Sequence, residues 1–233
     1  MPRLPLVEDC AAQSIPAGSV LLVVFDPSSQ WYNAIITITA GWLKQGGKVD
    51  YSAYTEPPEA VRFKLSRLGV NAVRLEMEEK LQINDWYTAT LGEKSKEKHS
   101  FPSLKVSDLS SFFSQLEIRP QPDPGWLNIS DNTSTVAKFN DEKSWVEYVL
   151  TGPIPMGRIR GHTMLRGLMD GVHSRWAYKQ LESAHDGIID FKFDETRDPP
   201  RNQMRIRTIR NVPFDGSWHQ LKISDNFEVK LET

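Results

Sequence analysis

The sequence predicts an α/β fold with a largely parallel central sheet flanked by helices and antiparallel strands at the C-terminus. Two observations carry this prediction. Short apolar runs alternate with segments of helical periodicity, which is typical of strand–helix–strand units. Closer to the C-terminus the segments alternate apolar and polar residues, as antiparallel strands with one solvated face do. At 233 residues, one domain over 1–233 accounts for the chain better than two small ones.

The first strand and helix are the clearest elements. Residues 19–25 form an apolar run with three β-branched valines, which indicates a central strand buried on both faces. Apolar residues then recur at helical spacing from Gln30 to Gln45, and two glycines end that helix. The next part of the chain is expected to hold strands at 49–55, 72–75 and 81–85 and helices at 59–68 and 106–116.

The second half continues this alternation and then changes character. A polar, lysine-rich loop is expected at 92–103 and a stiff, proline-rich connection at 120–124. After them we expect strands at 125–130 and 162–169 and helices at 142–150 and 174–184. The final antiparallel strands are expected at 187–193, 203–210, 218–223 and 227–231.

Composition and charge exclude several classes of protein. The hydrophobic fraction of 39% and charged fraction of 25% are those of ordinary globular chains, and a net charge of −2 attracts neither nucleic acid nor anionic membranes overall. No apolar segment is long enough to span a bilayer. A single cysteine, Cys10, excludes an internal disulfide and fits a reducing compartment, so a cytoplasmic location is expected. The five histidines show no paired ligand spacing, so we expect no metal site.

The turn between the first strand and helix, residues 25–32, is where such a fold would hold a phosphate. The first helical N–H groups are unpaired there, and the helix dipole is positive. A working phosphate-binding loop needs glycines, a lysine and a hydroxyl for magnesium. This turn reads Phe-Asp-Pro-Ser-Ser-Gln-Trp-Tyr and has neither glycine nor lysine. We therefore expect that it no longer holds a phosphate.

Seven short motifs in order make the chain resemble the RecA-superfamily ATPases of the KaiC-like type, a family common in archaea. They lie at residues 15–19, 25–32, 47–59, 69–71, 127–134, 186–190 and 204–211. The first reads Ile-Pro-Ala-Gly-Ser, and the fifth resembles a Walker B strand. The matches cover almost the whole chain. The resemblance implies a RecA-like P-loop NTPase fold whose usual ligands are ATP and magnesium.

The loop departs from the family pattern G-D-P-G-S-G-K-T. Three of its residues match: Asp26, Pro27 and Ser29. Five stand in place of the three glycines, the lysine and the threonine, in that order: Phe25, Ser28, Gln30, Trp31 and Tyr32. Phosphate without the lysine would be a poorly compensated charge, which costs several kcal/mol. The resemblance therefore implies a degenerate Walker A motif.

Other positions of the implied nucleotide site differ too. The family has a pair of carboxylates after the second strand, and the one that activates water is replaced here by Thr55, so that only Glu56 is left. A second family motif reaches the nucleotide across a subunit interface. Its lysine is replaced here by Thr208, while its arginine is present as Arg210. Asp131 stands at the Walker B position, with a capping role as the alternative. Glu56 and Asp131 are thus vestigial catalytic candidates.

Two structural alternatives stay open for the loop. Trp31 and Tyr32 either occlude the vacated pocket or are ordinary core residues of the helix, and Ser28 or Ser29 can cap the free N–H groups. Asp85 also ends a strand, where α/β ligands gather, although a turn carboxylate is the simpler interpretation.

A basic stretch at 157–162 lies near the region where RecA-type proteins carry DNA-contacting loops. Arg158, Arg160 and Arg166 are the candidate contacts to nucleic acid phosphates. A solvated strand face or a subunit interface is the competing interpretation.

These observations favour a catalytically inactive KaiC-like domain that is a regulatory or assembly partner of other proteins, such as an active paralogue or a second copy of itself. No cofactor, metal or membrane is expected. The first alternative is an ATPase that binds ATP and magnesium in an unusual pocket. The second is a DNA-binding accessory protein of recombination or repair.

Overall fold

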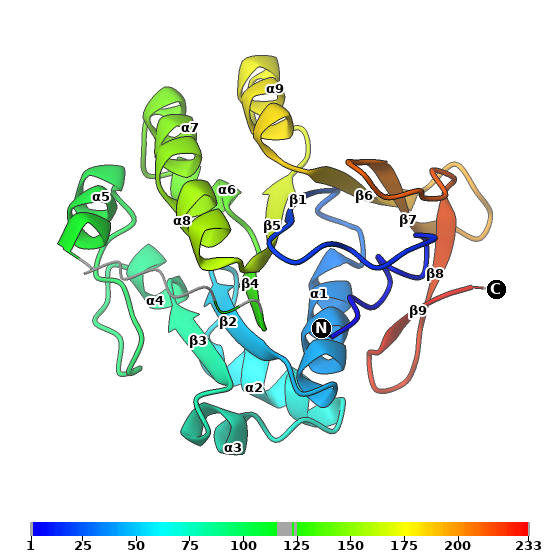
Figure 1. Ribbon diagram of the computed structural model, residues 1–233, viewed down its shortest axis with the longest axis horizontal. Coiled ribbons are helices and arrows are strands. Elements are labelled where there is room, and N and C mark those ends of the chain that lie inside the picture. The colour runs from blue at the N-terminus through cyan, green and yellow to red at the C-terminus, as the bar shows by residue number, and fades with distance from the viewer. Residues whose placement is uncertain (1, 116–122, 124, 233) are drawn as a thin grey trace.

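The strands of the computed structural model form a sheet in the order β3-β2-β4-β5-β1-β6-β7-β8-β9 (Figure 1). The structure describes residues 2–115, 123 and 125–232. The strands are β1 (Val20–Phe25), β2 (Lys48–Ala53), β3 (Leu81–Asp85), β4 (Trp126–Ser130), β5 (Thr163–Met169), β6 (Gly187–Asp194), β7 (Arg201–Ile209), β8 (His219–Ile223) and β9 (Val229–Leu231). The helices are α1 (Trp31–Lys44), α2 (Pro58–Arg67), α3 (Ala72–Met77), α4 (Tyr87–Thr90), α5 (Val106–Gln115), α6 (Ser134–Ala137), α7 (Glu142–Thr151), α8 (Pro153–Arg160) and α9 (Arg175–Ala184).

The predicted fold class is confirmed. Strands β3, β2, β4, β5, β1 and β6 pair in parallel, and β6, β7, β8 and β9 pair antiparallel. All six residues of β1 are buried, as their continuous apolar run predicts. Because the parallel strands point the same way, the turns after β1, β2, β3 and β4 lie along one edge of the sheet, where ligands of α/β proteins bind.

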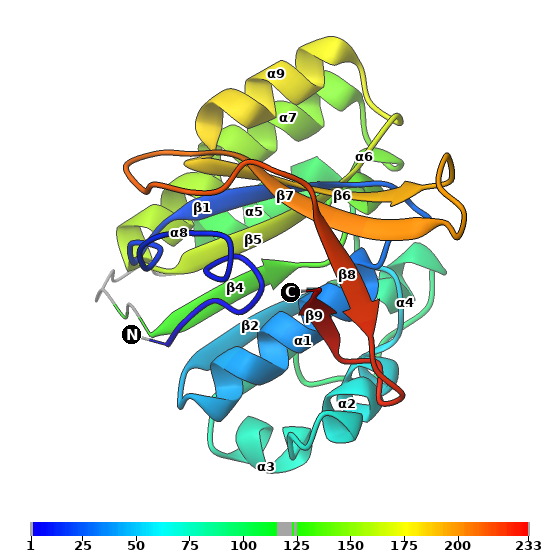
Figure 2. The same cartoon turned by 90° about the vertical axis from the view of Figure 1, so that its right-hand side faces the viewer.

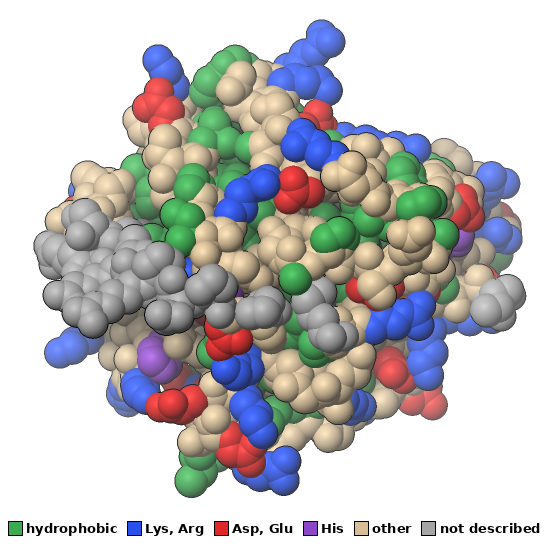
Figure 3. All heavy atoms as spheres, viewed as in Figure 1, with side chains coloured by type: hydrophobic (Ala, Val, Ile, Leu, Met, Phe, Trp, Pro, Cys, Tyr) green, Lys and Arg blue, Asp and Glu red, His purple; other side chains and the backbone are tan. Residues whose placement is uncertain are grey.

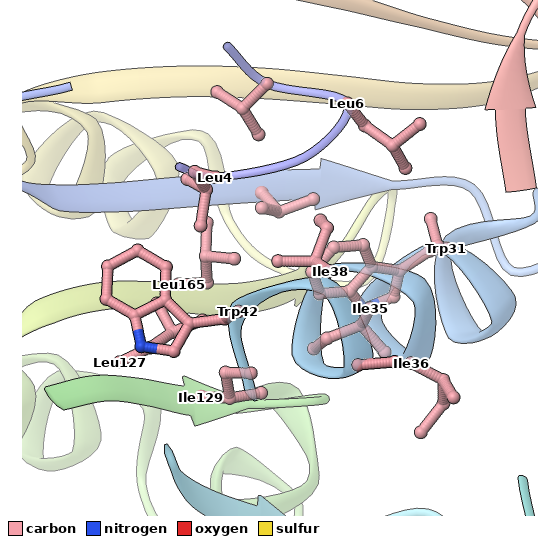
Figure 4. Packing of buried hydrophobic residues seen from close by; sticks show 14 of the residues in the cluster. Leu4, Leu6, Trp31, Ile35, Ile36, Ile38, Trp42, Leu127, Ile129 and Leu165 are labelled. Atoms are coloured by element: carbon pink, nitrogen blue, oxygen red, sulfur yellow. The ribbon is translucent and has the colours of Figure 1, made fainter. Parts of the chain in front are cut away.

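Helices cover both faces of the sheet. Figure 2 shows α1, α2 and α3 on one side of the sheet and α7 and α9 on the other. On the first face Trp31, Ile35, Ile38 and Trp42 of α1 lie over β4 and β5 (Figure 4). The N-terminal segment 2–19 adds buried apolar side chains to the same cluster. Over the described residues, no helix has the length and apolar character needed to cross a bilayer.

Two expectations about local structure were wrong. Residues 72–75 are not a strand but part of the helix α3, which the Asn71 side chain caps by accepting a hydrogen bond from the Arg74 N–H at 3.0 Å. The basic stretch at 157–162 is not a strand face, since it forms the last part of helix α8 and the turn after that helix. Pro153 begins that helix and Gly161 ends it with a φ of 70°.

The short helices α4 and α6 were also unforeseen. The other predicted strands and helices agree with the structure to within three residues at each end. Residue 116 and most of the proline-rich connection at 120–124 lie outside the described residues.

Candidate functional site

The turn after β1 is held by its own aspartate. The Asp26 carboxylate accepts a hydrogen bond from the Ser28 N–H at 2.7 Å, and the Asp26 carbonyl accepts one from the Ser29 N–H at 2.9 Å. No side chain caps α1, so the capping expected of Ser28 or Ser29 is not formed. The Asp26 side chain therefore forms an Asx-turn, in which it accepts a hydrogen bond from the backbone N–H two residues later. Gln30 occupies the N-cap position, but its side-chain oxygen accepts a hydrogen bond from the Asn33 side-chain amide at 2.7 Å and none from a backbone N–H of the helix.

Trp31 is the first residue of α1 and is completely buried. Its indole lies 5.9 Å from the Phe25 ring and 5.3 Å from the Phe191 ring, measured between centroids. The indole N–H donates to the backbone carbonyl of Asp131 at 2.7 Å. This contact joins the start of α1 to the end of β4, so the side chain is fixed by packing and by a buried hydrogen bond.

Tyr32 lies beside Trp31 at the same turn and is partly buried. Its ring meets the Phe25 ring edge-on at 5.4 Å, and its hydroxyl accepts a hydrogen bond from the Asn132 amide at 3.3 Å. Burial raises the pKa of Tyr32 to about 12, so its hydroxyl stays neutral. Phe25, Trp31, Tyr32 and Phe191 are called the aromatic cluster below.

Asp131 lies directly after β4 and is fully buried. Its carboxylate accepts hydrogen bonds from the Tyr54 N–H at 3.0 Å, the Thr55 N–H at 3.3 Å and the Thr55 hydroxyl at 2.7 Å. Burial raises the pKa of Asp131 to about 6, although these hydrogen bonds act in the opposite direction. The carboxylate therefore ties the turn after β2 to the turn after β4.

The other carboxylates of the predicted site also have partners. Glu56 pairs with Lys64 at 2.5 Å. Asp85 is buried and accepts from the Thr88 N–H at 2.9 Å and from the hydroxyls of Thr88 and Ser95 at 2.6 Å, which is a turn carboxylate in geometry. The structure thus brings Asp131, Trp31 and Tyr32 together, while Glu56 is engaged with α2.

Arg210 lies just after β7 and beside the start of β6, since the two strands are antiparallel and the Arg210 N–H donates to the Asp186 carbonyl at 2.8 Å. Its side chain is 57% exposed, and it donates to the Ser183 carbonyl at 3.0 Å. It also pairs with the Asp186 carboxylate at 3.8 Å, so its side chain is held near the start of β6 and not at the aromatic cluster. Thr208 pairs with Ile188 across β6 and β7.

The three arginines predicted to contact nucleic acid do not form one exposed surface. Arg158 is bound to the Ala184 carbonyl at 2.9 Å and to the Asp186 carboxylate at 3.1 Å. Arg166 is only 6% exposed, and Arg160 lines a cavity together with it. On the face seen in Figure 3, basic and acidic side chains are interspersed.

That cavity was not predicted from the sequence. It has a volume of about 490 Å³ and lies on the sheet face opposite α1, against α5, α7 and α8. Its floor consists of alternate residues of β2, β3, β4 and β5, among them Asp50, Ser52, Asn84, Asn128, Ser130 and Arg166. A parallel sheet covered on both faces normally has apolar residues there. The sequence does contain a signal for this site: in β2 and β4, which lie inside the sheet and should be apolar on both faces, polar residues alternate with apolar ones.

The sheet, with parallel strands and an antiparallel end, is similar in fold to solved KaiC-like structures. No protein-family model matches the sequence, and no curated protein matches it. The structure is similar to a KaiC-like protein of the hyperthermophilic archaeon Pyrococcus horikoshii OT3, with a TM-score of 0.70 and 14% identity over 99% of this chain and 96% of that one. It is also similar to an uncharacterized protein of Pyrococcus horikoshii that was crystallised with an unknown peptide, with a TM-score of 0.68 and 14% identity over 94% of this chain and 93% of that one.

Proposed function

We propose that residues 1–233 are one RecA/KaiC-like domain that does not hydrolyse ATP and is a regulatory or assembly partner of other proteins. The observation that carries this proposal is the buried Trp31 indole, hydrogen-bonded to the Asp131 carbonyl at 2.7 Å. In the family that this chain resembles, the corresponding residue is the lysine that neutralises the phosphates. Here the position contributes no charge, and its side chain belongs to the core.

The state of Asp131 supports the same conclusion. A Walker B carboxylate must be free to hold magnesium or its water, but this one accepts three hydrogen bonds from Tyr54 and Thr55. Moving it toward a metal would leave buried N–H groups without an acceptor, which costs about 1 to 3 kcal/mol for each group. Thr55, which replaces the water-activating carboxylate, supplies two of these bonds.

ATP binding is the first test of the proposal. We expect calorimetry of the full chain with ATP and magnesium to show no saturable heat below about 100 µM, and phosphate release to stay at the rate without protein. An active KaiC-like ATPase in the same assay is the positive control. Saturable ATP binding below that concentration, weakened by Tyr32→Ala, would establish the ATPase alternative instead.

Partner binding is the second test. We propose that an active KaiC-like paralogue or a second copy of the chain is the partner and that Arg210 takes part, because the matching family motif crosses a subunit interface and this side chain is exposed. Co-purification with the paralogue of the same host is expected to fall for Arg210→Glu. It should persist for Lys222→Glu, a matched charge reversal at another exposed site. Complex formation that Arg210→Glu leaves unchanged would exclude this surface.

A cytoplasmic location accords with a single cysteine, Cys10, which is buried and unpaired. DNA binding is the weaker alternative, because the burial of Arg166 leaves it unable to contact a duplex. Retention on single-stranded DNA at physiological salt that Arg158→Ala and Arg160→Ala abolish would favour it.

A further inference from the structure

The cavity on the face opposite α1 contains a cation that has no counter-ion among the described residues. Arg166 of β5 is 6% exposed and lines the cavity. Among the described residues, no carboxylate pairs with its guanidinium, and Tyr54, Tyr148 and His185 are titratable groups that interact with it electrostatically. Burial lowers the pKa of Arg166. A buried, unpaired charge is costly, so its presence needs a reason other than stability.

The carboxylate in the cavity floor, that of Asp50, already has hydrogen-bond partners. The Asp50 carboxylate accepts hydrogen bonds from the amides of Asn128, at 2.9 Å, and Asn84, and the Gln82 amide donates to the Asn84 oxygen at 2.7 Å. These residues are neighbours in the strand register, since Asp50 pairs with both Gln82 and Asn128. The Asp50 charge is therefore held by amides and is not available to neutralise Arg166.

Aromatic rings form one wall of the cavity. Trp86 stacks on Phe101 at 3.7 Å and on Tyr54 at 5.1 Å, measured between centroids, and all three residues line the cavity. Stacked rings offer a flat apolar surface to a planar ligand. A volume of about 490 Å³ lies in the range that small-molecule sites occupy.

We propose that this cavity binds a small organic anion, with its carboxylate or phosphate group on Arg166 and a planar body against the aromatic wall that Tyr54, Trp86 and Phe101 form. A guanidinium binds both oxyanions through two parallel hydrogen bonds, which explains why an arginine is kept at this buried position. Arg160 also lines the cavity and adds positive charge near it. The site lies on the sheet face opposite α1, so the proposal is independent of whether the loop after β1 binds ATP.

The proposal is tested with three aromatic anions (benzoate, phenyl phosphate and 4-hydroxyphenylacetate) and with neutral benzamide. Calorimetry of the full chain is expected to show saturable binding of at least one anion below about 10 mM and of benzamide at least about tenfold more weakly. Arg166→Met should weaken the anion at least about tenfold, whereas Arg175→Met, at an exposed arginine outside the cavity, should change nothing.

Two further measurements separate binding from folding. Arg166→Met removes an unpaired buried charge, so its melting temperature should not fall below that of the natural chain. Met156→Trp narrows the cavity without changing a charge and is expected to block the anion as well. The proposal is overturned if none of the three anions binds, if benzamide binds as tightly, or if both cavity variants bind as the natural chain does.

Discussion

Replacing Trp31 by phenylalanine is expected to lower the free energy of unfolding by about 2 to 4 kcal/mol. The indole N–H donates to the Asp131 carbonyl at 2.7 Å, and removing it leaves a buried acceptor unsatisfied, which costs about 1 to 3 kcal/mol. The smaller ring also leaves unfilled space between Phe25 and Phe191, which adds about 1 kcal/mol. For a chain of this length the melting temperature should fall by roughly 5–15 °C.

Urea unfolding followed by circular dichroism measures this change. The slope of the free energy against urea concentration should stay the same, because the variant exposes the same surface on unfolding. Trp176→Phe is the matched control: Trp176 is 44% exposed, so its replacement should stay within about 0.5 kcal/mol of the natural chain. If Trp31→Phe is as stable as that control, Trp31 is not a structural element, and its ring is free to stack on a ligand.

Two further variants test the same region. Burial raises the pKa of Asp131 to about 6, above its value in the unfolded chain, so the natural chain should lose stability relative to Asp131→Asn as the pH rises from about 4 to 6. The loss should reach at most about 3 kcal/mol in urea unfolding, and a constant difference across this range would contradict it. Gly167→Ala places a Cβ 2.3 Å from the Asp131 carbonyl oxygen and should cost at least about 2 kcal/mol in thermal unfolding. Gly216→Ala, whose Cβ would meet its nearest atom at 3.4 Å, should cost less than about 0.5 kcal/mol, and equal losses would contradict the clash.

The fold could be predicted wherever the pattern of apolar residues was long enough to distinguish the repeat of a helix from that of a strand. The six residues of β1, all buried, and the fourteen residues of α1, ten of them buried, gave unambiguous strand and helix signals. Residues 72–75 were too few to show a period, and there the Asn71 cap decides for helix. Helix α8 was missed because Pro153 and Gly157 suggest a loop, although proline is compatible with a first helical turn.

The candidate site was predictable in part for a different reason. The loop after β1 is one continuous segment, so its missing glycines and lysine are visible in the sequence. The burial of Trp31 depends on Phe191, which is 160 positions away, and no local pattern shows that contact. The cavity floor likewise depends on the strand order, which places Asp50, Asn128 and Arg166 on neighbouring strands.

The aromatic cluster and the cavity lie on opposite faces of the sheet at the middle of β5, beside the end of β4. On β5, Arg166 lines the cavity, while the next residue, Gly167, lies against Trp31 and Asp131 on the other face. Thr133, in the turn after β4, also lines the cavity. It joins this turn to β5, because its N–H and its hydroxyl both donate to the Gly167 carbonyl at 2.8 Å.

A ligand on Arg166 would act one residue from Gly167, which lies against Trp31. The Trp31 indole N–H donates to the Asp131 carbonyl inside a group of tightly packed rings, and such packing resists gradual deformation. Anion binding should therefore protect the Trp31 indole N–H from hydrogen exchange, and Arg166→Met should abolish that protection. Unchanged exchange on binding would show that the two faces of the sheet are uncoupled.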